Sequence, residues 1–339
     1  MKKCIAVCVV FLSAFVLFAG GRRENSDNLD AFAWMEDGLY DGFPGVNPLL
    51  VRGDVVTAGS STVAPLAAVI VERYKEDGLQ EQITVDVIGS GAGFERFTVV
   101  GETDVSNASR AIKDSEIENA AKIGRLPIPF RIGTDALSVV VAKGNTFVAD
   151  VTAEELKLIF STADRWSDVN SSWPSKPIQR YIPGTDSGTF DFFVELVFDE
   201  DPAPILQAAN TQQSEDDNVL AQGVAGNPYS VGFFGYAYYA ENSDSLNVLS
   251  VEGITPNPAT VEKANSDSIS GNAARGGYPL ARPLFIYSDA GIIRSRPHVA
   301  AYVAYFINNV DAVIDDVGYF RADLDRARQN WLDAMEGAY

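Results

Sequence analysis

The sequence predicts an α/β fold with parallel layers, and two observations predict it. Short β-like runs alternate with helix-like segments over most of the chain, a pattern typical of parallel α/β structure. The run 136–142 is continuously apolar, as expected for a strand that is buried on both faces of a sheet. The 339 residues are enough for two ordinary domains with a sizeable core.

The periodicity of apolar residues predicts the elements in order. Residues 83–88 alternate in polarity as a strand does. The expected strands are 54–57, 83–88, 105–108, 126–130, 136–142, 179–182 and 283–287. The expected helices are 63–74, 94–100, 114–122, 153–160 and 189–198, with two or three amphipathic helices within 297–335. The segments 218–224 and 231–236, the second of them aromatic, continue the alternation, and the polar stretch 252–278 predicts a long connection.

The N-terminal end predicts export. Two lysines precede the apolar run 4–19, and small residues follow it, which is the pattern of a signal peptide. The run is too short to predict a transmembrane span. We therefore expect a signal peptide at 1–20 and a polar tether at 21–53, with an uncleaved N-terminal anchor as the alternative. The expected location is the periplasm or the outer face of the cytoplasmic membrane.

Composition argues against several functions. Both cysteines, Cys4 and Cys8, lie in the predicted signal peptide, so the mature chain would have no disulfide, zinc–thiolate site or cysteine nucleophile. The single His298 argues against multi-histidine metal sites and a serine triad. The formal charge is −20, and without the first twenty residues 24 basic and 46 acidic residues remain, a net of −22. Nucleic acid and anionic membrane surfaces are therefore poor partners. We expect no enzyme activity, no cofactor and no metal.

Three similar turns, at 59–63, 89–93 and 184–189, carry the functional prediction. Each follows a β-like run, contains Gly with Ser or Thr, and leads into a helix-like segment. Such turns point backbone N–H groups outward at a helix N-terminus, where the helix dipole favours negative charge. One such turn is usually a plain N-cap. Three in one chain favour a site for a tetrahedral oxyanion, held by local dipoles despite the acidic net charge.

At this point the chain resembles the phosphate-binding components of bacterial ABC phosphate importers, a branch of the type II periplasmic-binding-protein family. The resemblance covers roughly residues 50–335. It depends on six segments in the family's order, which are TAGSSTVAPL, VIGSGAGFERF, DVSNASRAI, IGTDALSVVVAKGN, TDSGTFDFF and YPLARPLFIY.

The resemblance implies two α/β lobes joined by two crossing strands, with the ligand cleft between the lobes. Lobe I would comprise 54–131 and 283–339, and lobe II would comprise 135–255. The crossings would be 132–134 and 256–282. Closure of the cleft by a hinge motion would exclude water from the ligand.

The resemblance also implies a ligand set on the matching positions. The residues expected to contact phosphate are Ser61, Thr62, Val63, Ser90, Gly91, Ser109, Arg110, Ser187, Gly188 and Thr189. Hydroxyls and backbone amides would donate to the anion, and Arg110 would offer a planar fork to its oxygens. The implied function is an extracytoplasmic receptor, expected to be a monomer, that captures inorganic phosphate and delivers it to an ABC permease.

Two departures from the family pattern leave alternatives open. Well-studied members have an arginine where this chain has Pro183, and some have an aspartate where it has Ser109. That aspartate accepts the proton of hydrogen phosphate and so helps to reject sulfate. Asp186 or Glu95 could substitute for it, and Arg96 could supply the missing charge.

The alternatives are a receptor for another tetrahedral oxyanion, or a phosphate sensor or surface protein without transport. An enzyme that uses Ser187 or Thr189 as nucleophile lacks an evident base.

Overall fold

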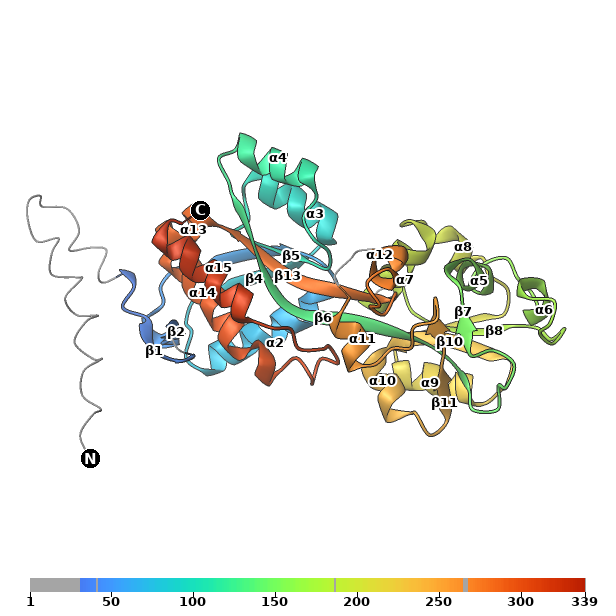
Figure 1. Cartoon of the computed structure of the whole chain (residues 1–339). Helices are drawn as coiled ribbons and strands as arrows, with labels where there is room; N and C mark the ends of the chain where they lie inside the picture. Colours follow the sequence, from blue (N-terminus) through green and yellow to red (C-terminus); the bar gives the residue numbers. More distant parts are fainter. Residues whose placement is uncertain (1–30, 41, 186, 265–267, 339) are drawn as a thin grey trace, which may run out of the picture. The chain divides into compact units, whose positions relative to one another are not determined.

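The computed structural model describes residues 31–40, 42–185, 187–264 and 268–338. Residues Trp34–Tyr339 form one compact unit, and the elements described below belong to it. The unit mixes α-helices with a long sheet, as predicted, and Figure 1 shows strands β6 and β13 side by side in its middle. The predicted signal peptide lies outside the described residues.

A nine-stranded sheet organises the described residues, in the order β4-β3-β5-β13-β6-β10-β8-β9, with β11 paired to β6. Strands β3, β4 and β5 are parallel to one another, and so are β8, β9 and β10. The bounds are β3 Val55–Gly59, β4 Ile83–Val87, β5 Val105–Ala108, β6 Pro127–Ala142, β8 Gln179–Pro183, β9 Thr211–Ser214, β10 Ser230–Gly235, β11 Leu246–Val248 and β13 Ala281–Asp289.

Helices flank the sheet and connect its strands. The first half of the chain carries α2 Val63–Glu76, α3 Ser90–Glu95, the π-helix η2 Arg96–Val100, α4 Asp114–Lys122, α5 Ala153–Ile159 and α6 Trp166–Val169. The second half carries α7 Gly188–Phe198, α8 Ala203–Leu206, α9 Asp217–Ala225, α10 Tyr236–Glu241, α11 Pro258–Glu262, α12 Ile269–Ala273, α13 Ala290–Ser295, α14 Pro297–Asn309, the 3₁₀ turn η3 Val310–Ala312 and α15 Asp325–Glu336. The remaining strands β7 Asp150–Val151 and β12 Ser250–Val251 form a small parallel pair.

Strand β6 is longer than predicted and joins the two halves of the sheet. The sequence predicts two strands separated near Gly133, but the structure has one strand of 16 residues. Its first part pairs with β13 and its last part with β10 and β11. The backbone stays extended because β13 pairs with it through residues 127–136, and Thr134 also exchanges two hydrogen bonds with Phe320, at 2.9 and 2.8 Å. Local sequence reveals neither contact. The predicted lobe boundaries remain a prediction.

The predicted tether ends earlier than expected. Residues 35–50 form the hairpin of β1 Met35–Tyr40 and β2 Phe43–Val46, followed by the 3₁₀ turn η1 Pro48–Leu50. Trp34 and Phe43 are buried, and each ring makes a T-shaped contact with Trp331, at centroid distances of 6.4 and 5.3 Å. The prediction that the tether extends to residue 53 was wrong, because Trp34 and Phe43 pack this otherwise polar segment against Trp331.

The long connection expected at 252–278 contains helices α11 and α12. Asn257 and Ser268 cap them, because each side chain accepts a hydrogen bond from the backbone of the first turn. Asn, Ser and Pro in this stretch are therefore helix-start signals as well as turn formers. Tyr278 at its end is fully buried, and β13 begins three residues later.

Candidate anion-binding site

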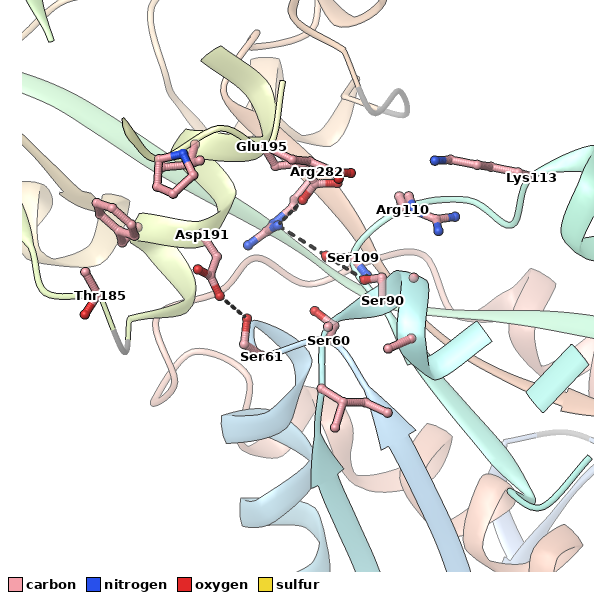
Figure 2. A pocket seen from close by; sticks show the side chains of 18 of the residues that line it. Ser60, Ser61, Ser90, Ser109, Arg110, Lys113, Thr185, Asp191, Glu195 and Arg282 are labelled. Atoms are coloured by element: carbon pink, nitrogen blue, oxygen red, sulfur yellow. Dashed lines mark hydrogen bonds and ion pairs between the residues drawn. The ribbon is translucent and has the colours of Figure 1, made fainter. Parts of the chain in front are cut away.

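A cavity of about 670 Å³ lies where β3, β4 and β5 end and where α7 and β13 begin. Figure 2 shows its side chains, which come from both halves of the sheet. The lining residues are Ser60, Ser61, Ile88, Gly89, Ser90, Gly91, Ala92, Ser109, Arg110, Lys113, Glu116, Thr185, Phe190, Asp191, Val194, Glu195, Glu200, Pro202, Leu206 and Arg282. Five of the ten predicted site residues are among them, namely Ser61, Ser90, Gly91, Ser109 and Arg110.

The first turn joins β3 to α2. Gly59 has φ +145°, and a Cβ there would lie 2.0 Å from the carbonyl oxygen of Asn107, so the turn requires glycine. Ser60 Oγ accepts hydrogen bonds from the amides of Thr62 and Val63, at 3.2 and 3.3 Å. Those two predicted donors therefore already have a partner, and both residues lie just behind the cavity wall. Ser61 Oγ faces the cavity and donates to a carboxylate of α7.

The second turn joins β4 to α3 and packs against the end of β5. Ser90 Oγ accepts a hydrogen bond from the amide of Ser109, and the two hydroxyls lie 3.1 Å apart. Gly91 faces open space, since the nearest atom to a Cβ there would be Arg110 Nη2, at 4.0 Å. The two serines and this glycine thus form one polar corner of the cavity.

The third turn brings α7 to the start of α2. Ser187 caps α7 by accepting a hydrogen bond from the amide of Thr189 at 3.2 Å. Gly188 approaches α2 so closely that a Cβ would lie 3.2 Å from Thr62 Cα. Thr62 Oγ1 also lies 3.4 Å from the Gly188 carbonyl oxygen, to which it donates. Residues 187–189 do not line the cavity themselves, and Asp186 lies outside the described residues.

The comparisons with known proteins agree with this architecture. A family profile for a PBP superfamily domain matches residues 49–310. Protein SphX of Synechococcus elongatus is 37% identical over 79% of this chain and 77% of its own length. The phosphate-binding protein PstS of Staphylococcus epidermidis is 33% identical over 79% of each chain. This chain belongs to the PBP superfamily, in the family that includes SphX and PstS.

A solved structure of this family supports the assignment. The crystal structure of a possible phosphate-binding protein from Planctomyces limnophilus superposes with a TM-score of 0.74 at 32% identity, covering 84% of this chain and 99% of that one. The type II fold that the sequence predicts is therefore confirmed. Among the described residues, no helix has the length and apolarity that a membrane span requires.

Arg110 was predicted to offer its guanidinium to phosphate, but in the structure this group contacts a carboxylate of the protein. Its guanidinium forms a two-pronged ion pair with Glu116, with distances of 2.7 and 2.9 Å, and both side chains are largely buried. The guanidinium carbon also lies 4.9 Å from the ring centroid of Phe94. Such a bidentate pair satisfies the fork that the prediction reserved for an anion.

Two of the three suggested substitutes, Glu95 and Arg96, do not reach the cavity. Glu95 is exposed and is not part of the lining. Arg96 pairs with Asp86 at 2.6 Å and with Glu102. Neither residue is placed to replace the missing aspartate or arginine of the family pattern.

The sequence reasoning missed the charged residues that line the cavity beside the turns. Arg282 lies at the start of β13, and Asp191 and Glu195 lie one helical turn apart on α7. Asp191 Oδ2 accepts from Ser61 Oγ at 3.1 Å (Figure 2). The signals that could have identified them are an isolated arginine in the apolar segment 278–287 and two acidic residues four positions apart after the third turn.

Burial shifts the pKa values of the ion pair between Asp135 and Arg282, of which Arg282 lines the cavity. Asp135 and Arg282 are both almost fully buried. Burial raises the pKa of Asp135, against the opposing attraction of Arg282. Burial likewise lowers the pKa of Arg282, against the attraction of Asp135 and Glu195. The site thus contains a guanidinium that is withdrawn from water.

Proposed function

We propose that this protein is an extracytoplasmic receptor that captures inorganic phosphate and delivers it to an ABC permease. The observation that carries the proposal is the convergence of the turns on one cavity, which Ser60 and Ser61 line from the first turn, Ser90 and Gly91 from the second, and Thr185 from the third. The similarity to SphX and PstS over most of the chain supports the choice of phosphate.

Binding would depend on fixed donors rather than on overall charge. Hydroxyls of Ser61, Ser90 and Ser109 face the cavity, and hydrogen bonds to an ionised acceptor are worth roughly twice those between neutral groups. The starts of α2 and α7 add the positive ends of two helix dipoles. The net charge of −20 disfavours binding of nucleic acid, while the hydroxyl and amide donors of the turns act on the ligand at short range.

The site favours binding over catalysis. The candidate nucleophiles Ser187 and Thr189 do not line the cavity, and the hydroxyl of Ser187 is used to cap α7. A serine or threonine nucleophile needs an adjacent base. We therefore propose a monomeric receptor without enzyme activity, at the outer face of the cytoplasmic membrane or in the periplasm.

Calorimetric titration tests the proposal. The purified protein, freed of carried-over ligand, is titrated with phosphate and then with sulfate. Tight phosphate binding with little or no sulfate binding is expected. Preference for sulfate or for another oxyanion would refute phosphate as the ligand, and release of phosphate from a phosphate ester would refute the absence of catalysis.

A further inference from the structure

Arg282 lines the cavity near the start of β13, beside β6, the strand that joins the two halves of the sheet. It is the second residue of β13, and in the ladder it lies directly opposite Asp135 of β6. Only 2% of its surface is exposed, yet its side chain lines the cavity. A cation that is buried and still faces an anion site has little water to solvate it.

The guanidinium contacts the first turn, the third turn and the residue that follows β5. Arg282 Nη1 lies 3.2 Å from Ser109 Oγ, and Nη2 donates to Thr62 Oγ1. Nη2 also donates to the carbonyl oxygen of Gly188, at 3.2 Å. An anion that accepts a hydrogen bond from the Ser109 hydroxyl would therefore also lie within reach of Nη1.

Aromatic packing and carboxylates hold the guanidinium in place. Its carbon lies 3.6 Å from the ring centroid of Phe192, which covers one face of the group. Asp135 Oδ2 lies 3.3 Å from Nε, and Glu195 Oε2 lies 3.4 Å from Nη1. Both separations are longer than the 2.7 to 2.9 Å typical of a strong charge-assisted hydrogen bond, so an anion could displace these carboxylates more readily than it could displace a close bidentate partner.

The other arginine of the cavity differs in this respect. Arg110 has both Nη atoms on Glu116, at 2.9 and 2.7 Å. A phosphate would have to compete with that bidentate pair for Arg110. For Arg282 it would compete with long, single contacts to two carboxylates and with neutral oxygen acceptors of Ser109, Thr62 and Gly188.

We propose that Arg282 is the charged ligand of the bound phosphate and that Arg110 serves to hold the cavity wall. The inference rests on the proposed function, because it names the cation for the same site. Arg282 lies on β13, next to the strand β6 that joins the two halves of the sheet. Its side chain would therefore connect the bound phosphate to Ser109, to Gly188 and to Asp135 of β6.

Paired substitutions with phosphate calorimetry test the inference. Arg282→Gln is expected to weaken phosphate binding by about 10–150-fold, the range for loss of a hydrogen bond to a charged group. Arg110→Gln, the matched control, is expected to change the dissociation constant less than about threefold. Arg282→Lys keeps the charge but not the fork and is expected to fall between the parent and Arg282→Gln.

Two further measurements separate ligand contact from folding. Arg282→Gln leaves Asp135 buried without its partner, so the double variant Asp135→Asn/Arg282→Gln removes that unpaired charge and is expected to show the same loss of affinity. In Arg282→Ala, millimolar guanidinium chloride is expected to restore part of the phosphate affinity, which a merely structural role would not explain.

The outcomes are distinguishable. If the parent binds phosphate and the Arg282 variants bind it as tightly, the assignment of Arg282 is overturned while the receptor function stands. A large loss in Arg110→Gln with none in Arg282→Lys would reverse the two roles. If the parent does not bind phosphate at all, the proposed function and this inference both fail.

Discussion

A methyl group added at Gly188 tests whether the starts of α2 and α7 must meet for the anion to bind. A Cβ at this position would lie 3.2 Å from the Cα and N atoms of Thr62 and 3.3 Å from the carbonyl carbon of Ser61. Carbon atoms prefer about 3.5–4.0 Å. All three neighbours are backbone atoms, so neither side chain can rotate away and the helices must separate by a few tenths of an ångström.

The cost follows from that overlap. Overpacking of this kind costs about 1–3 kcal/mol, which corresponds to about 5–150-fold in a dissociation constant if it falls on the bound state. We expect Gly188→Ala to weaken phosphate binding within this range in calorimetric titrations. The ligand-free melting temperature should change little, because we expect the two helix starts to meet only when the cleft closes around the anion.

Gly235→Ala is the matched control, since a Cβ there would lie at an ordinary 3.8 Å from Tyr238 Cδ2. It should bind phosphate as the parent does. The reasoning is refuted if Gly188→Ala also binds as the parent does, or if its whole effect appears as destabilisation of the ligand-free protein.

Three other substitutions give separate tests. Gly91→Ala should leave the melting temperature unchanged, because the nearest atom to a Cβ there would be 4.0 Å away. It should weaken phosphate binding about tenfold in calorimetry if the ligand approaches this backbone. Asp191→Asn should raise sulfate affinity relative to phosphate a few-fold in parallel titrations, because it removes an exposed negative charge from the cavity wall. Asp217→Asn should stabilise the protein by about 1–2 kcal/mol at pH 8 and hardly at pH 4 in urea unfolding. Burial raises the pKa of Asp217 to about 6 from 3.8, so the stability that its protonated form supplies is lost as the pH rises through 6; equal effects at both pH values would contradict this.

Much of the fold was predictable because local periodicity determines it. The predicted strand 105–108 and helix 114–122 coincide with β5 and α4. The errors come from contacts that are distant in sequence. The unbroken course of β6 depends on its pairing with β13 and Phe320, and the early end of the tether depends on Trp331. Local patterns carry no information about such partners.

The same distinction separates the predicted from the missed site residues. Ser61 and Ser90 lie in turns that follow strands, so their place at the cavity could be predicted from local sequence, whereas Ser109 was expected only from the resemblance to the family. Arg282 lies 220 residues after Thr62, whose hydroxyl it contacts. Only the pairing of β13 with β6 and β5 brings it to the turns. A strand register therefore decides which arginine is available to the anion.

Carboxylates in the cavity wall offer a way to select phosphate over sulfate although Ser109 replaces the aspartate that some family members have. Asp191 and Glu195 line the cavity from α7, and Asp191 already accepts a hydrogen bond from the Ser61 hydroxyl. A carboxylate repels a fully ionised anion, but it can accept a hydrogen bond from an anion that keeps a proton. Hydrogen phosphate has such a proton and sulfate has none. Carboxylates on α7 could thus do what an aspartate at position 109 does elsewhere, and the sulfate-to-phosphate ratio of Asp191→Asn measures how much of the discrimination depends on them.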